Sequence, residues 1–104
     1  MATLTITKIH CSRKQDVTGD DEPVIDIGGQ QRWTGKMGKG DTRFPNEVEQ
    51  FSNSILVELK ERDGNNPKKD KSLGKWTVYA TPTGNKTLTA TSSGYLYEVT
   101  ANVQ

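Results

Sequence analysis

The chain has 104 residues, with 14 basic and 13 acidic side chains and a net charge of +1. This length fits a single domain, residues 1–104, with a modest core, and the hydrophobic fraction of 31% lies above that of a disordered chain. The balanced charge argues against a nucleic-acid-binding protein, and no apolar run approaches the roughly 20 residues that cross a membrane.

Cysteine usage and the first residues give expectations about the compartment. The single Cys11 excludes an internal disulfide and a thiol pair for a metal site. Residues 1–7 lack the basic, apolar and small-residue succession of a secretory signal. We therefore expect a cytoplasmic protein, or one exported without a classical signal peptide.

Short apolar runs with interleaved threonines, separated by glycine, proline or asparagine, predict strands rather than helices. In chain order, the expected strands are 4–11, 24–27, 31–37, 48–51, 55–60, 73–80, 86–91 and 94–103. Gly28 and Gly29 mark a hairpin, and residues 38–46 are expected to form a loop. About seven or eight strands without an amphipathic helix predict an all-β antiparallel sandwich.

The first strand contains an irregularity and a tempting pair of side chains. The apolar parity changes between Ile6 and Ile9, which predicts a bulge or burial of both faces. His10 and Cys11 are neighbours, but adjacent strand residues point to opposite faces and cannot easily share a ligand. We expect Cys11 to be a small core residue and His10 to be exposed.

The later strands alternate clearly between apolar and polar residues, which predicts their inward faces. In the strand 55–60 the inward residues are expected to be Ile55, Val57 and Leu59. In the last strand the predicted inward face consists of Tyr95, Tyr97, Val99, Ala101 and Val103.

Two acidic, glycine-containing turns, 16–23 and 61–70, separate apolar strands. Together they hold seven of the 13 acidic residues. Crowded carboxylates repel one another unless a cation neutralises them, and Ca²⁺ takes about six to eight oxygen ligands. The two turns are therefore predicted to meet at one end of the sandwich and to hold Ca²⁺. The alternative is that both are ordinary solvated turns, because Asp, Asn and Gly suit such backbone conformations.

Three segments occur in the order and spacing of one β-sandwich family. Residues 16–23 resemble its pattern of an aspartate, a glycine-bearing loop and Ser-Asp-Pro, with Asp21 at the serine and Glu22 at the second aspartate. Residues 46–51 look like its Asn-Pro-x-Trp-x-Glu-x-Phe segment without the proline and tryptophan. Residues 55–63, followed by Asp70 and Leu73-Gly74, resemble its Val-x-Asp-x-Asp strand, further aspartate and Leu-Gly. The chain therefore resembles a divergent C2 domain, the calcium-dependent β-sandwich family.

The resemblance implies a calcium site bridging the two acidic turns. Asp16 and Asp63 match the central ligands, and carboxylates on either side would complete the shell. The full implied set is Asp16, Asp21, Glu22, Glu61, Asp63 and Asp70, and Asp20 or Asp21 could substitute for Glu22. The chain departs from the family in carrying Glu at two ligand positions and in being shorter than a typical member.

Many C2 domains use bound calcium to dock on anionic lipid, often with apolar residues at the loop tips. Here the tips carry no large apolar side chain, only Val17, Asn65, Asn66 and Pro67. Deep membrane insertion is therefore not expected. Three lysines, Lys68, Lys69 and Lys71, would either bind phosphate headgroups or simply solvate the turn.

Catalysis is not expected. The sequence contains no nucleophile elbow, phosphate loop or zinc-spacing motif. Paired carboxylates serve glycosidases, but a chain of 104 residues leaves little room for a cleft. We expect a calcium-binding, non-catalytic module whose partner is anionic lipid or another protein.

A structural or assembly protein is the alternative. Small polar sandwiches with exposed edge strands can pair into homo-oligomers. Thr87, Thr89 and Thr91 form a threonine face that would suit an edge strand. In that case Ca²⁺ would only stabilise the fold or be absent.

Overall fold

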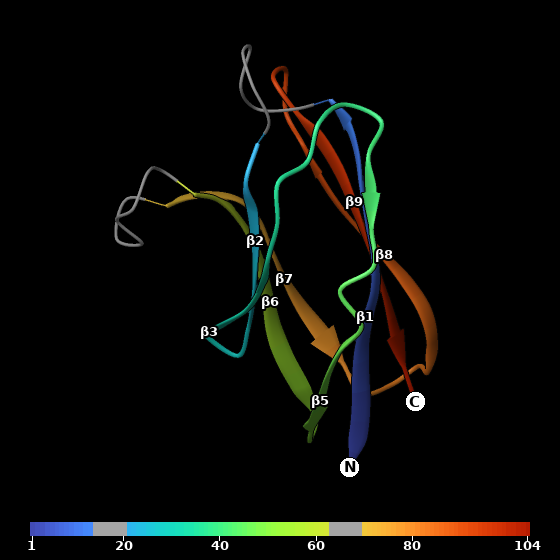
Figure 1. Cartoon of the computed structure of the whole chain (residues 1–104). Helices are drawn as coiled ribbons and strands as arrows, with labels where there is room; N and C mark the ends of the chain where they lie inside the picture. Colours follow the sequence, from blue (N-terminus) through green and yellow to red (C-terminus); the bar gives the residue numbers. More distant parts are fainter. Residues whose placement is uncertain (14–20, 63–69) are drawn as a thin grey trace.

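The computed structural model describes residues 1–13, 21–62 and 70–104 (Figure 1). Over these ranges the chain forms nine strands and no helix. The strands are β1 (Ala2–Arg13), β2 (Pro23–Ile27), β3 (Gln30–Thr34), β4 (Thr42–Arg43), β5 (Glu47–Phe51), β6 (Ser54–Glu61), β7 (Lys71–Tyr79), β8 (Gly84–Thr91) and β9 (Leu96–Val103). The predicted all-β class is confirmed, and the unpredicted strand is the two-residue β4, inside the expected loop 38–46.

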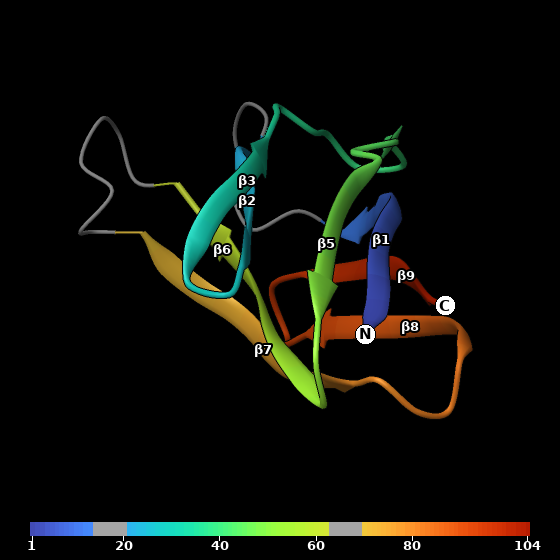
Figure 2. The same cartoon turned by 90° about the horizontal axis from the view of Figure 1, so that it is seen from below.

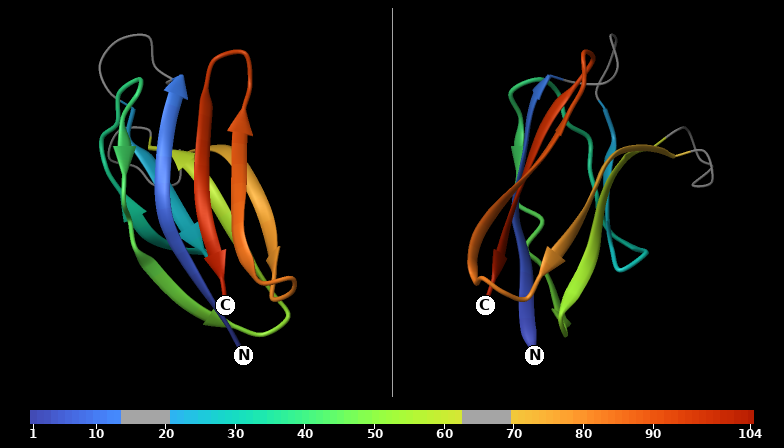
Figure 3. Two further views of the ribbon diagram at one scale, coloured as in Figure 1. Left: turned by 90° about the vertical axis from the view of Figure 1, so that its right-hand side faces the viewer. Right: turned by 180° about the vertical axis from the view of Figure 1, so that it is seen from behind.

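The strands form two antiparallel sheets that pack face to face (Figure 3). The first sheet has the order β4-β1-β9-β8, with β5 also pairing with β1. The second has the order β3-β2-β6-β7. Figure 2 shows the second sheet on one side and β1, β8 and β9 on the other. The antiparallel sandwich is therefore as predicted.

The predicted bulge in β1 is present. Its pairing with β9 shifts register between Ile6 and Lys8. Because of this extra residue, Ile6, Ile9 and Cys11 all face the core and are 0% exposed. The prediction of a core Cys11 is confirmed, while His10 faces the other way and is half-buried.

The predicted inward faces of β6 and β9 are confirmed. In β9, buried and half-buried residues alternate along the whole strand. In β6, Val57 and Leu59 are buried and Ile55 packs against the core at the strand's start. These faces, together with the inward residues of β1, make up most of the hydrophobic core.

Backbone geometry explains the two glycines of the β2–β3 hairpin, and close packing explains Gly74. Gly28 and Gly29 have φ of +61° and +83°, the left-handed pair that a two-residue hairpin between β2 and β3 requires. At Gly74, an added Cβ would lie 2.7 Å from the Trp76 ring and 3.2 Å from the Cβ of Ala90. Gly74 therefore permits the close approach of β7 to β8.

The third strand ends earlier than the sequence predicts, at Thr34 rather than at Met37. Met37 leaves the sheet and forms an isolated bridge with Asp21, with reciprocal backbone hydrogen bonds of 2.9 Å. The Met37 side chain is 0% exposed, so burial of this apolar residue favours the bridge over continued pairing with β2.

Arg32 closes one side of the sandwich. From β3 in the second sheet, its guanidinium lies 3.3 Å from Glu47 and 2.7 Å from Glu49, both on β5 in the first sheet. It also donates a 2.8 Å hydrogen bond to the carbonyl of Val48. The charges and one backbone acceptor of β5 are thus satisfied by a side chain from the opposite sheet.

Candidate cation-binding end

The residues that flank the two acidic turns lie on adjacent strands at one end of the second sheet. Pro23, the first residue of β2, is the register partner of Glu61, the last residue of β6. β1 ends and β7 begins on either side of these turns, so the described residues bring the bases of both turns together. Asp16 and Asp63 lie outside the described residues.

Glu22 and Glu61 are in direct contact at this end. The backbone N–H of Glu22 donates a 3.1 Å hydrogen bond to Oε1 of Glu61, and Glu61 is 8% exposed. The N–H of Arg62 donates a 3.0 Å bond to the carbonyl of Glu22. One predicted ligand therefore joins the base of the first turn to the base of the second.

Asp21 lies in the interior between the sheets. Its carboxylate accepts a hydrogen bond from the hydroxyl of Tyr97 on β9, and both residues are 0% exposed. Burial raises the pKa of the Tyr97 hydroxyl well above its ordinary value, and the contacts with Asp21 and the Cys11 thiol raise it further. The Tyr97 hydroxyl therefore remains a neutral hydrogen-bond donor to Asp21.

Asp70 is accompanied by protein cations. Its Oδ1 lies 3.4 Å from Nε of Arg62, and its side chain is only 4% exposed. Lys60, on the neighbouring strand β6, forms a 2.8 Å ion pair with Asp26. The hydrogen bond to Asp26 raises the pKa of Lys60, and the charges of Asp26, Glu58 and Asp70 contribute further. Part of the acidic charge at this end is thus balanced within the chain.

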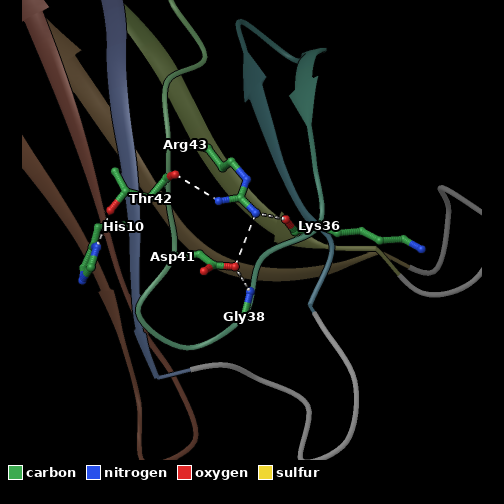
Figure 4. A network of polar contacts seen from close by, with 6 residues as sticks. All are labelled: His10, Lys36, Gly38, Asp41, Thr42 and Arg43. Atoms are coloured by element: carbon green, nitrogen blue, oxygen red, sulfur yellow. Dashed lines mark hydrogen bonds and ion pairs between the residues drawn. The ribbon is translucent and has the colours of Figure 1, made fainter.

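The loop between β3 and β4 completes this end of the molecule (Figure 4). It is tied to β1 because Gly40 N–H donates to the Cys11 carbonyl at 2.7 Å and Cys11 N–H donates to the Asp41 carbonyl at 3.0 Å. Gly38 N–H donates to the Asp41 carboxylate at 2.7 Å, and Arg43 lies 3.4 Å from the same oxygen. These internal bonds occupy the backbone N–H groups of Gly38 and Gly40 and fix the loop against β1.

His10 and Cys11 do not form a catalytic pair. His10 Nδ1 lies 2.8 Å from the hydroxyl of Thr42 on β4, on the outer side of the first sheet (Figure 4). The Cys11 thiol is buried on the inner side. The expected separation of the two side chains is confirmed.

No protein-family model matches this chain, and no curated protein matches it by sequence. The similar solved structures are C2 domains. The C2A domain of plant extended synaptotagmin 1 aligns with a TM-score of 0.61 at 12% identity, over 98% of this chain and 90% of that one. A second structure, described as a C2 domain, aligns with a TM-score of 0.60 at 12% identity, over 100% of this chain and 99% of that one. This chain has the fold of a C2 domain.

The tandem C2A and C2B domains of extended synaptotagmin 2 give the same result. They align with a TM-score of 0.58 at 16% identity, covering 99% of this chain and 39% of that one. At such identities the similarity shows the C2-like fold alone. The ligands of this C2-like sandwich must therefore be judged from its own residues.

The described carboxylates fit a hard cation in chemistry, but they are not sufficient in number. Over residues 1–13, 21–62 and 70–104, no three His, Cys, Asp or Glu side chains are grouped to hold one metal ion. Glu22 and Glu61 lie together, whereas Asp21 is bonded to Tyr97 and Asp70 is paired with Arg62. A calcium shell at this end therefore needs Asp16 and Asp63 as well.

Two residues that shape this end were not found from the sequence. Tyr97 was assigned to the core as an apolar residue, although a buried hydroxyl needs a partner. Arg62 stands within the acidic stretch itself and was available as a counter-ion.

In the part of the chain that is described, no helix is long and apolar enough to cross a membrane.

Proposed function

We propose that the chain is a non-catalytic C2-like module that binds Ca²⁺ between its two acidic turns. The observation that carries this proposal is the pairing of Pro23 with Glu61, with Glu22 bonded to the Glu61 carboxylate. It supports a common site because it brings the bases of both acidic stretches to one place. Bound Ca²⁺ would supply the positive charge that crowded carboxylates require.

The proposed ligands fall into two groups. Asp16, Glu22, Glu61 and Asp63 form the first group and would bind the ion directly, with Glu61 held at the site by the N–H of Glu22. Asp21 and Asp70 form the second group, because each must first exchange a side-chain partner, Tyr97 or Arg62, for the ion. The ion would thus bind through the first group and draw on the second only at the expense of existing contacts.

Ordering of the two turns is the proposed consequence of binding. A cation that binds the folded state and not the unfolded state stabilises the fold by mass action. The ordered turns would then present a surface to a partner, either anionic lipid headgroups or another protein. The burial of Cys11 away from His10 supports a binding role without catalysis.

Thermal unfolding with Ca²⁺, with Mg²⁺ and with excess chelator tests this proposal. Ca²⁺ at 100 times its dissociation constant adds about 2.7 kcal/mol, which raises Tm by roughly 10 °C in a domain of this size. Mg²⁺ is expected to give less, because it demands tighter octahedral geometry. Asp63→Asn and Asp16→Asn should each remove most of the rise.

Glu98→Gln is the matched control, since Glu98 is a carboxylate on β9 that faces His10 and Thr89 and takes no part in the proposed site. It should keep the full calcium effect. An equal Tm with Ca²⁺ and with chelator would mean that the acidic turns are solvated loops only.

If Ca²⁺ raises Tm as expected, co-sedimentation with anionic and neutral vesicles, with and without Ca²⁺, separates a lipid partner from a protein partner.

A further inference from the structure

The exposed edges of the two sheets differ in how their backbone is protected. An unprotected edge strand is a template for pairing with another chain, and proteins commonly block it with charges, bulges, very short strands or covering side chains. Within the described residues, three of the four sheet edges carry such protection. The fourth edge, β8, carries much less.

The edge formed by β4 and β5 is blocked in two ways. β4 has only two residues, and the adjoining β5 is covered by Arg32, which binds Glu47, Glu49 and the carbonyl of Val48. At the edge of the second sheet, β3 has only five residues, and its pairing with β2 shifts register between Ile25 and Asp26.

The β7 edge is protected by charge and by irregular pairing. It carries two exposed lysines, Lys71 and Lys75. Its pairing with β6 shifts register between Leu59 and Lys60, which twists the edge. A second chain would therefore meet like charges along this strand.

β8 has eight residues and pairs only with β9 within the described chain (Figure 3). Its single charged residue is Lys86, near its start. On the outer face, Thr87, Thr89 and Thr91 are exposed, as the sequence predicts. On the inner face, Leu88 is 8% exposed. The strand is therefore long, regular and almost uncharged.

We propose that two copies of this chain associate through β8, in antiparallel pairing that joins their first sheets into one continuous sheet. The partner is a second copy because the strand is self-complementary. A two-fold axis at Leu88 places Thr87 of one copy opposite Thr89 of the other, and Asn85 opposite Thr91. These polar pairs can hydrogen-bond across the joint, and no pair of like charges is brought face to face.

The register follows from the alternation of faces. A shift by one residue would place the threonines of one copy beside the apolar residues of the other. With the axis at Leu88, the two leucines lie side by side on the inner face and extend the core beneath the joint. The association uses no residue of the acidic turns, so it does not require a cation.

Sedimentation velocity and light scattering in excess chelator test this proposal, over about 10 µM to about 1 mM, the range of a weak association. The mass should rise from 11.5 kDa towards twice that value with concentration. Thr87→Lys with Thr89→Lys should hold the chain at 11.5 kDa, since introduced lysines would face one another across the joint. Thr87→Glu with Thr89→Glu should do the same.

The decisive experiment is to mix the double-lysine variant with the double-glutamate variant. Introduced lysines of one chain then face introduced glutamates of the other, so the mixture should regain the double mass. This rescue also shows that each variant is folded. Thr77→Lys, at an exposed position of β7, is the matched control and should associate as the wild type does.

A wild-type mass of 11.5 kDa at all concentrations would overturn the proposal. Unchanged association of the double-lysine variant would overturn it too, because the contact would then lie elsewhere. Failure of the mixture to associate would refute the proposed register.

Discussion

The two acidic stretches look alike in sequence, yet the structure anchors their carboxylates in different ways. At the end of the first turn, Asp21 is buried and bonded to Tyr97, a residue of the opposite sheet. At the end of the second, Asp70 is paired with Arg62, which belongs to the same stretch of chain. The first carboxylate therefore contributes to the contact between the sheets, whereas the second is balanced locally.

This difference decides which of the two carboxylates a bound cation can more easily recruit as a ligand. Release of Asp21 would break a buried polar contact between the sheets, which is costly because the hydroxyl and the carboxylate would lose each other's hydrogen bond. Release of Asp70 would break its ion pair with Arg62, but the incoming cation would replace the guanidinium charge, and the Arg62 side chain is 17% exposed and so in contact with solvent. Asp70 is thus the easier of the two to recruit, and Arg62 is the group that competes for it.

The largest expected loss of stability follows from breaking the Tyr97–Asp21 contact. Tyr97→Phe removes a hydrogen bond to a buried carboxylate and should lower the free energy of unfolding by about 1.5–3 kcal/mol. Urea unfolding at neutral pH measures this loss. Tyr95→Phe is the matched control, because its hydroxyl donates at 2.9 Å to the neutral carbonyl of Leu73, and it should cost only about 1 kcal/mol. Equal losses would show that Asp21 has no special role.

Alkaline pH should reduce the stability that the buried Tyr97 hydroxyl contributes. The pKa of Tyr97 is raised from its ordinary value of 10.0 by burial and by Asp21, so above pH 10 the unfolded state releases this proton while the folded state keeps it. Stability contributed by Tyr97 is therefore full below pH 10 and falls above it, by about 1.4 kcal/mol per pH unit. The difference between wild type and Tyr97→Phe in urea titrations at pH 9 to 11 isolates this contribution.

If the two proteins lose stability in parallel as the pH rises, other groups such as lysines account for the loss. The Tyr97 hydroxyl would then have an ordinary pKa in the folded state, and its burial against Asp21 would have to be abandoned.

A further effect on stability is expected at Arg62. Arg62→Gln takes the guanidinium away from an Asp70 side chain that is only 4% exposed, and should lower the free energy of unfolding by about 1–3 kcal/mol. If Ca²⁺ binds as proposed, the same change removes the competitor for Asp70 and should tighten calcium binding by about fivefold. Calorimetric titration measures the affinity.

Lys75→Gln is the control for Arg62→Gln, since Lys75 is an exposed lysine of β7 that makes no ion pair within the described residues. It removes the same charge without touching Asp70. Weaker calcium binding by Arg62→Gln would mean that the arginine supports the site rather than competing with it.

Much of the fold could be predicted from local patterns. The change of parity between Ile6 and Ile9 predicts the bulge in β1, and the alternation from Tyr95 to Val103 predicts the inward face of β9. These predictions succeed because side-chain alternation in a strand is a local property. The nearness of the two turns was predicted from their crowded carboxylates and is implied by the resemblance to C2 domains, and the pairing of Pro23 with Glu61 supports it.

The internal partners of the acidic residues could not be predicted in the same way. Tyr97 and Asp21 are 76 residues apart in the chain, and only the packing of one sheet on the other brings them together. The expectation that crowded carboxylates need a metal ion also left out the protein's own cations. β4 and the Met37 bridge were missed because both depend on tertiary contacts rather than on a local pattern.

The first and last strands are hydrogen-bonded through Thr3 and Gln104, at the end of the sandwich opposite to that where β1 ends and β2 begins (Figure 1). Because the ends are adjacent, a short peptide could link them and the chain could be reopened at the exposed turn between β7 and β8 without altering the strand order. A fluorescent protein or surface tether fused at either end would project from this side, leaving the acidic end accessible for measurements on immobilised protein.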